Sequence, residues 1–207
     1  MSTRLGKTVF GGGRLVNRDH AVSFTFNGKT MHGFEGDTLA SGLLANDQML
    51  VGRSFKYHRP RGIVASGAEE PNGLVNLGVG GHFEPNQRVT TQDLFDGLEA
   101  SSQNHWPSLE FDVGAVNAKL GRFMPAGFYY KMFIHPRPMW KHVYEPIIRH
   151  SPGLGKAPTD RDVAIYEHLY AHVDVIAVAC AISGLSAALA ARRPRSRTFL
   201  VELEARW

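Results

Sequence analysis

The chain has 207 residues, 43% of them hydrophobic and 20% charged, and its net charge at pH 7 is +4. This composition is typical of a globular protein and excludes a disordered one. No apolar run reaches the roughly 18 residues of a membrane span, and the N-terminus lacks the apolar segment of a secretory signal. The single cysteine, Cys180, cannot form an intrachain disulfide and favours a cytoplasmic location.

The N-terminal part of the sequence predicts a hairpin. Residues 1–18, which include a run of three glycines, are expected to form a loose arm. Val22–Phe26 alternates apolar and polar residues, the period of a half-buried strand. Asn27-Gly28 is a strong hairpin signal because both residues tolerate positive φ. Lys29–Phe34 is therefore predicted as the return strand.

A helix and further strands are predicted after the hairpin. Asp37-Thr38 is expected to cap a helix that runs to about Asp47. Three leucines would share its buried face: Leu39, Leu43 and Leu44. Leu74–Leu77 and Gln87–Thr91 are the predicted later strands, and Gln92–Ala100 a short helix. Hairpin, helix and strands in this order predict a β-grasp domain.

The segment that begins at Gly52 is expected to be a basic strand running into a loop of small residues, which ends at Pro71-Asn72-Gly73. In plant-type ferredoxins such a loop holds a [2Fe–2S] cluster through cysteines spaced C-x4-C-x2-C, with a fourth further on. Those three positions here are Ala65, Glu70 and Gly73. The loop thus has the shape of a cluster loop without its ligands.

Basic and aromatic residues are interleaved in the predicted strand, a pattern that can also bind nucleic acid. These residues are Arg53, Phe55, Lys56, Tyr57, His58, Arg59 and Arg61. A strand with one wet, basic face explains the pattern without nucleic acid, since alternate side chains point to opposite faces. A third explanation is a strand that faces an anionic cofactor or a partner subunit. We expect no nucleic-acid binding.

Seven prolines lie between Ser101 and Pro158. Because proline interrupts regular structure, and aromatic side chains in this stretch offer packing surface, we expect an ordered connector with short helices. His168 and His172 would share one face if Val163–His172 is helical. They lack the H-E-x-x-H pattern and a third ligand, so we predict no metal site.

The last stretch has the outline of a βαβ unit. A buried strand is predicted at Asp174–Val178, a helix at Gly184–Ala191 and a strand at Thr198–Val201 that ends at Glu202. In the dinucleotide-binding fingerprint, three glycines allow the tight turn, the approach of the pyrophosphate and close helix–strand packing. An acidic residue about twenty positions on binds a ribose hydroxyl.

The fingerprint positions fall on Ala179, Ala181, Gly184 and Glu202, so the third glycine and the acid are present and the first two glycines are alanines. A Cβ costs about 1 kcal/mol where φ must be positive, and the second methyl stands where the phosphate should approach. Two such changes could weaken dinucleotide binding by orders of magnitude. The alternative is a buried start of a small-residue helix that binds nothing.

Several long stretches of this sequence resemble the sequences of one protein family. They are Ser54–Asn72, Ser102–Leu109, Pro125–Lys131, Tyr144–Arg149 and Ala171–Val175. In these stretches the chain resembles the N-terminal portion of the α subunit of heterotetrameric sarcosine oxidase, whose ferredoxin-like domain is known without cluster cysteines. The resemblance covers the chain from about residue 20 to about residue 190.

Together with the patterns above, the resemblance implies the α+β class. A β-grasp ferredoxin-like domain is expected at residues 19–105, a connector at 106–172 and an incomplete, Rossmann-type βαβ unit at 173–207. The resemblance also implies a flavoprotein complex that oxidatively demethylates sarcosine, with FAD and FMN elsewhere in the complex. NAD would bind at Gly184 and Glu202, weakened by Ala179 and Ala181. No catalytic residue and no iron–sulfur cluster are expected in this chain.

The chain stops where the family continues, so we expect a fragment. A single βαβ unit leaves strand edges and apolar faces uncovered. Two functions remain open at this point. One is an oxidoreductase component that acts with other sarcosine oxidase subunits, and the other is a catalytically silent module that only contacts them.

Overall fold

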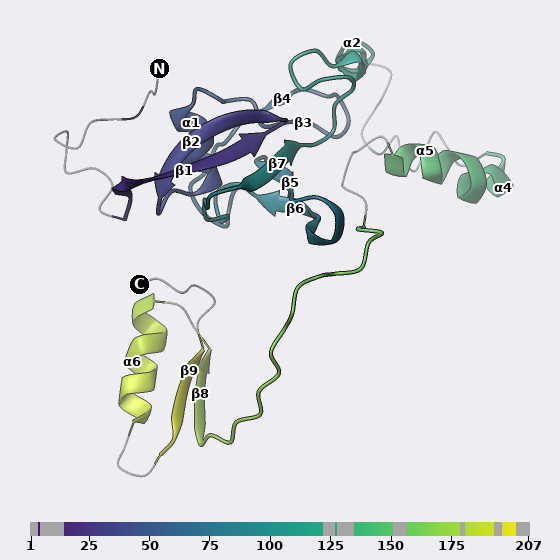
Figure 1. Cartoon of the computed structure of the whole chain (residues 1–207). Helices are drawn as coiled ribbons and strands as arrows, with labels where there is room; N and C mark the ends of the chain where they lie inside the picture. Colours follow the sequence, from purple (N-terminus) through teal and green to yellow (C-terminus); the bar gives the residue numbers. More distant parts are fainter. Residues whose placement is uncertain are drawn as a thin grey trace. The chain divides into compact units, whose positions relative to one another are not determined.

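The computed structural model describes Arg4 and residues 15–121, 127, 135–150, 157–178, 181–192 and 196–201. The chain divides into two compact units, Met1–Ala164 and Ile165–Trp207. The first unit holds a sheet with helices, and the second holds two strands and one helix (Figure 1). The predicted mixed α+β class is confirmed. No helix in the described part of the chain has the length and apolar character needed to cross a membrane.

A five-stranded mixed sheet forms the frame of the first unit, in the order β2-β1-β7-β5-β6. Its strands are β1 (Asn17–Phe26), β2 (Lys29–Glu35), β5 (Leu74–Leu77), β6 (Glu84–Arg88) and β7 (Leu98–Ser102). β1 and β2 form the predicted antiparallel hairpin, whereas β1 and β7 run parallel. Of the five strands, the first and the last along the chain are therefore neighbours in the sheet.

Asn27 forms the hairpin turn and also fixes β7. Asn27 and Gly28 have φ values of 50° and 76°, as the sequence predicts for this turn. The Asn27 side-chain oxygen accepts a hydrogen bond from the backbone N–H of Ser102 at 2.8 Å, and its nitrogen donates to the Ser102 hydroxyl at 2.8 Å. One asparagine therefore joins the turn to the end of the central strand.

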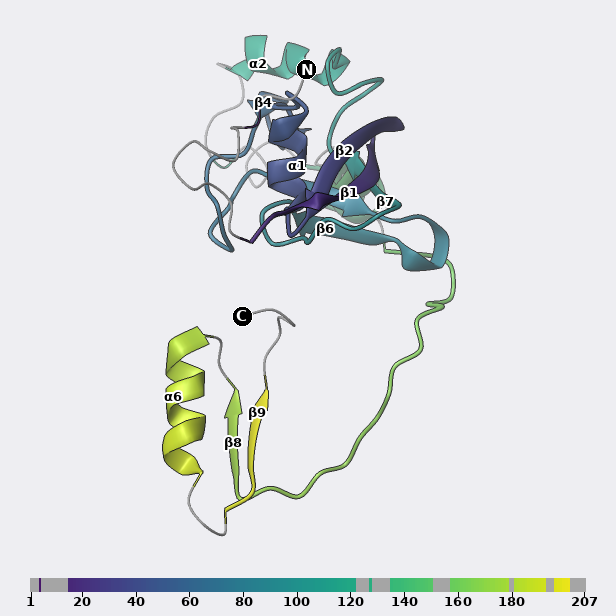
Figure 2. The same cartoon turned by 60° about the vertical axis from the view of Figure 1, so that its left-hand side comes forward.

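Helix α1 (Leu39–Ala45) packs beside β2, as Figure 2 shows. It begins after Thr38, whose hydroxyl caps the N–H of Ser41 as predicted. Leu39 and Leu43 are fully buried, but Leu44 is 44% exposed, so its predicted place on the buried face is wrong. The buried side of the helix is formed by Leu39, Ala40, Gly42, Leu43 and Ala45, and Leu44 lies just outside this arc.

The core of the first unit lies between α1 and the sheet. Its fully or nearly fully buried members come from both: Phe24, Phe26, Leu39, Leu43, Val51, Val75, Val89, Leu98 and Leu109. Leu109 lies beyond the last strand, so the segment after β7 contributes to the core as well. This packing holds the loops described below in fixed positions.

The N-terminal arm is attached at one described point. Both guanidinium nitrogens of Arg4 donate to the carboxylate of Asp37, at 2.8 and 2.6 Å, and the guanidinium carbon lies 5.2 Å from the centroid of the Phe34 ring. The strand that follows begins at Asn17, five residues earlier than Val22, where the alternating pattern starts. Residues 1–3 and 5–14 of the predicted loose arm lie outside the described residues.

The predicted basic strand after Gly52 is wrong. Only two short, paired strands form, β3 (Gly52–Arg53) and β4 (Pro60–Arg61), and a turn separates them. Within the turn His58 has a φ of 52° and donates its N–H to the Ser54 carbonyl, while the Ser54 hydroxyl accepts from the N–H of Arg59. These local bonds, in which Ser54 is the acceptor, replace the ladder bonds of an extended strand.

The predicted helix at Gln92–Ala100 is also wrong, because its end is strand β7. Leu98 and Ala100 are buried on one face of this strand and pair with Phe24 and Phe26 of β1. Gly97, with a φ of 81°, provides the turn that precedes the strand. Strand β6 begins at Glu84 and ends at Arg88, earlier than the predicted Gln87–Thr91.

The described connector contains the predicted short helices together with irregular segments. These helices are η2 (Val113–Ala115), α2 (Val116–Lys119), α4 (Arg137–Met139), the π-helix η4 (Trp140–Tyr144) and α5 (Glu145–His150), and a further short helix, η1 (Gly80–His82), follows β5. Val163–His172 is irregular rather than helical. Ile165 and Tyr170 there are 95% and 98% exposed, so no packing stabilises a helix.

The second unit is built from β8 (Val175–Val178), α6 (Ala181–Ala191) and β9 (Thr198–Val201). β8 and β9 are parallel and α6 lies between them in sequence. β8 was expected to be buried, but Ile176 and Val178 are 57% and 71% exposed. A sheet of two strands with one helix lacks the second layer that would cover these side chains.

Candidate functional site

The loop of residues 62–73 closes around the carboxylate of Glu70, whose residue is only 1% exposed. One oxygen, Oε2, accepts the backbone N–H groups of Val64 at 2.8 Å and Ala65 at 2.6 Å. The other, Oε1, accepts those of Asn72 at 2.8 Å and Gly73 at 3.1 Å. A single side chain therefore joins the two ends of the loop.

These four donors decide the charge state of Glu70. Burial by itself raises the pKa of this carboxyl, but the N–H groups of Ala65, Asn72, Val64 and Gly73 outweigh it and hold the pKa below its usual value. Among the described residues, no basic side chain forms an ion pair with this carboxylate. The negative charge is thus stabilised by backbone dipoles.

The rest of the loop is tied to the chain around β6. The Thr90 hydroxyl donates to the Gly67 carbonyl at 2.7 Å, and the guanidinium of Arg88 donates to the Glu70 carbonyl at 3.2 Å. The exposed carboxylate of Glu69 accepts the N–H groups of Ser66 and Gly67 at 3.3 and 3.1 Å. The loop is therefore an ordered part of the domain.

The residues at the three cluster positions do not fit a cysteine-ligated iron–sulfur cluster. Ala65 offers no ligand atom, and the Glu70 carboxylate is already fully engaged by the backbone. At Gly73 a Cβ would lie 2.7 Å from the Cγ2 of the buried Val89, so there is no room for a larger side chain. Within the described residues, no group of three or more histidine, cysteine, aspartate or glutamate side chains could hold a metal ion.

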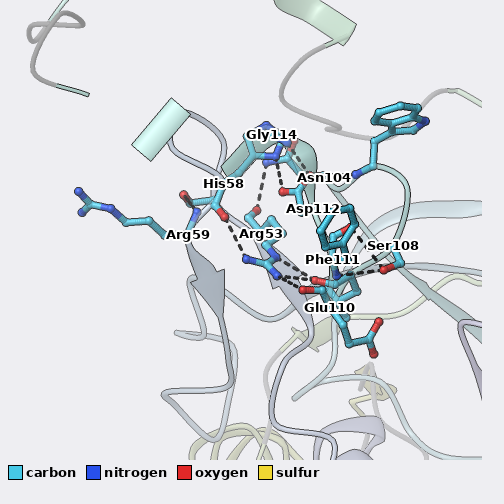
Figure 3. Close-up of polar contacts among 12 residues, drawn as sticks. Arg53, His58, Arg59, Asn104, Ser108, Glu110, Phe111, Asp112 and Gly114 are labelled. Atoms are coloured by element: carbon cyan, nitrogen blue, oxygen red, sulfur yellow. Dashed lines mark hydrogen bonds and ion pairs between the residues drawn. The ribbon is translucent and has the colours of Figure 1, made fainter. Parts of the chain in front are cut away.

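A second polar site joins the turn between β3 and β4 to the residues after β7 (Figure 3). The Nδ1 of His58 and the carboxylate of Asp112 are 2.7 Å apart and both residues are buried. The other carboxylate oxygen of Asp112 accepts the N–H groups of Trp106 and Gly114, each at 3.0 Å. Burial raises the pKa of Asp112, but these bonds and His58 lower it below its usual value.

Arg53 completes this second site. Its guanidinium donates to the Leu109 carbonyl at 2.9 and 2.6 Å and to the Glu110 carbonyl at 3.0 Å (Figure 3). A histidine–aspartate pair can orient a base for a nucleophile. In the described part of the chain, however, no nucleophilic side chain is hydrogen-bonded to His58. The pair therefore fixes the segment after β7 to the turn.

The interleaved basic residues do not form one wet, basic face. Arg53 is used inside the fold, and Lys56 and Arg59 both lie 4.7 Å from the Tyr57 ring centroid. Arg61 donates to the Asn72 side chain at 2.8 Å, next to the Glu70 loop.

The predicted dinucleotide residues are only partly described. Gly184 is buried within α6, and Ala181 is the first residue of that helix. Ala179 and Glu202 lie outside the described residues, as does Cys180. His168 and His172 lie in the irregular, exposed segment before β8 and do not share a helical face.

Sequence reasoning missed three buried carboxylate sites: those of Asp37, Glu70 and Asp112. Asp37 accepts from Arg4, from the Ser41 hydroxyl at 2.8 Å and from the Phe34 N–H at 2.9 Å. Glu70 had a usable signal, because it stands at a cluster position. The basic partners, Arg4 of Asp37 and His58 of Asp112, lie 33 and 54 residues away, and nothing in the sequence indicates these pairings.

Comparison with known proteins shows which family and which proteins this chain is similar to. Residues 19–105 match the family described as "2Fe-2S iron-sulfur cluster binding domain". The sarcosine oxidase subunit alpha of Rhizobium meliloti (strain 1021) is 57% identical over 188 residues, which are 91% of this chain and 19% of that protein. The subunit alpha of Corynebacterium sp. (strain U-96) is 29% identical over 193 residues, which are 92% of this chain and 15% of that protein.

A solved structure, L-proline dehydrogenase from P. horikoshii, is 26% identical and covers 44% of this chain and 17% of its own, with a TM-score of 0.34 that is too low to compare folds. The chain spans 19% or less of the length of the two α subunits named above. The match to them nevertheless extends over nearly all of this chain. The resemblance predicted from the sequence is thus confirmed, and this chain is a relative of the sarcosine oxidase α subunits.

Proposed function

We propose that this chain is the N-terminal part of a sarcosine oxidase α-subunit-like component, which takes part in oxidative demethylation of sarcosine together with other subunits. The observation that carries the proposal is 57% identity over 91% of the chain to a protein named as such a subunit. The aligned region includes residues from both compact units, because it is longer than either of them. The chain is expected to reside in the cytoplasm, as its single cysteine favours.

The chain serves as a scaffold and binding part rather than as the catalytic part. The polar sites among the described residues are internal: Glu70 binds backbone, and His58 binds Asp112. FAD and FMN, which the demethylation needs, are assigned to the rest of the complex. The ferredoxin-like domain is assigned a structural role without a cluster, since Ala65, Glu70 and Gly73 replace the ligands.

The second unit is assigned to NAD binding, in a weakened form. The parallel order of β8 and β9 with α6 between them supports this assignment, because dinucleotide-binding folds begin with such a unit. Gly184, buried in α6, would allow close packing of helix on strand. Glu202 would bind the ribose, while the methyl groups of Ala179 and Ala181 would hinder the phosphates.

A tagged copy of the chain, isolated from its native cell, tests the proposal. We expect it to bring down partner subunits in a yellow complex whose visible absorption bleaches when sarcosine is added. The association should withstand salt, whereas nucleic-acid binding would fall steeply with it. A colourless chain without partners would contradict the proposal and favour the alternative, a catalytically silent module.

A further inference from the structure

All three cluster positions of the 62–73 loop meet at one point. The amides of Ala65 and Gly73 donate to the carboxylate of Glu70, so two of the positions bind the side chain of the third. Val64 and Asn72 add their amides from the neighbouring positions. The loop therefore presents converging N–H groups to a single buried anion.

Converging backbone N–H groups form concavities that bind anions, and many phosphate and iron–sulfur sites are built in this way. Hydrogen bonds of this kind to the sulfur atoms tune the reduction potential of clusters held by cysteine thiolates. A carboxylate offers the same negative charge in a smaller volume, with about four acceptor positions on its two oxygens. Four donors and four positions match at Glu70.

We propose that the 62–73 loop is an anion cradle in which the carboxylate of Glu70 is the built-in ligand, held where this kind of loop would otherwise surround an anionic cluster. The carboxylate closes the loop without a metal ion. The cradle binds a small carboxylate, and in this chain the side chain of Glu70 provides that carboxylate.

Glu69 provides a matched control for Glu70. It is the neighbouring residue, carries the same carboxylate and also accepts two backbone N–H groups, those of Ser66 and Gly67. It differs in being exposed, and it uses one oxygen for both bonds. If a substitution acts only through the lost charge or through backbone propensity, it should have the same effect at Glu69 as at Glu70.

The test is chemical rescue in the full chain. Glu70→Ala removes the built-in carboxylate and leaves the four donors, so sodium formate should raise the Tm of this variant with the logarithm of formate concentration. Formamide, which has the same shape without the charge, and sodium chloride at equal ionic strength should not. The wild-type chain and Glu69→Ala should show no formate-specific rise. An equal response of Glu70→Ala to all three additives would overturn the proposal.

Hydrogen exchange in the unmodified chain covers the case in which Glu70→Ala does not fold. The amides of Val64, Ala65, Asn72 and Gly73 should exchange slowly and at a common rate, because they share one buried acceptor. The amides of Ser66 and Gly67, bound to exposed Glu69, should exchange much faster. If the four amides exchange as fast as those two, the loop is not an anion cradle.

Discussion

Three buried carboxylates hold segments of the first unit in place, and each accepts at least one backbone N–H group. Asp37 and Glu70 are each 1% exposed and Asp112 is 8% exposed. A buried charge is costly unless its hydrogen bonds are complete. Asp37 fastens the arm at Arg4, Glu70 closes its loop, and Asp112 fastens the segment after β7. At the scale of single residues, these side chains determine how the loops are held.

Glu70→Gln tests this account with a small change in shape. The amide NH2 of glutamine would face two backbone N–H donors, which would lose their acceptor. Since each unpaired buried donor costs about 1–3 kcal/mol, we expect the free energy of unfolding to fall by about 2–6 kcal/mol in urea titration. Glu69→Gln, on the surface, should leave the urea midpoint unchanged. Equal midpoints for the two variants would contradict the account.

The pH dependence of stability follows from the same carboxylates. Burial raises the pKa of Asp37, Glu70 and Asp112, but their hydrogen bonds outweigh it and the folded-state pKa of each lies below its usual value. The unfolded chain therefore binds more protons as acid is added. Stability should be fully present above about pH 5 and fall as the pH drops through the folded-state values.

His105 adds to this loss of stability in acid from a higher pH. Burial lowers the pKa of its imidazole, so the unfolded state takes up a proton first as the pH falls below about 6.5. Urea midpoints measured from pH 8 to pH 3 should therefore decline, slightly at first and steeply below about pH 5. A midpoint that stays constant or rises toward pH 3 would contradict both assignments.

Among the structural elements, those with local signals could be predicted from the sequence. The hairpin follows from Asn27-Gly28, and the start of α1 from the cap at Thr38. β7 could not be predicted, because its pairing of Leu98 with Phe24 joins residues far apart in the chain. The Asp96-Gly97 pair before it is a local turn signal that the helix prediction did not use.

Of the candidate site, too, only the part with a local signal could be predicted from the sequence. The sequence places Glu70 at a cluster position, but not the inward turn of its carboxylate, which depends on amides from both ends of the loop. The pair of His58 and Asp112 depends on a positive φ at His58 and on packing across 54 residues. Such contacts exist only once the sheet has formed.

Gly114→Ala tests how the segment after β7 is held. A Cβ at this position would overlap the His58 ring, which the pair with Asp112 keeps in place. Overpacking of this kind costs about 1–3 kcal/mol, and the urea midpoint should fall accordingly. Gly52→Ala is the control, because the nearest atoms to its Cβ would lie at ordinary distances of 3.8 and 3.9 Å. Similar midpoints for both variants would contradict the packing described here.

The nucleotide assignment is testable at the start of α6. Restoring glycine at both altered positions, in the double variant Ala179→Gly/Ala181→Gly, should tighten NAD binding tenfold or more, about 1.4 kcal/mol or more, in a calorimetric titration. Ala188→Gly, which also weakens the helix but lies away from its start, should not. No gain in the double variant, or an equal gain in the control, would contradict a dinucleotide site here.

In the second unit, apolar side chains lie open on both the helix and the sheet. Ile182 and Leu189 of α6 are 82% and 62% exposed, and Ile176 of β8 is 57% exposed. Exposed apolar surface of this kind marks a place where other protein elements pack. This observation supports the proposal that the chain acts within a larger assembly.

Structure and binding are the roles proposed for this chain, and the oxidation of sarcosine is proposed for the assembly. Sarcosine-dependent oxygen uptake by the purified chain is the most direct test, measured alone and in the complex isolated from the native cell. We predict no turnover by the chain alone, even with added FAD, FMN and NAD, and turnover by the complex. Turnover by the purified chain alone would contradict the central claim.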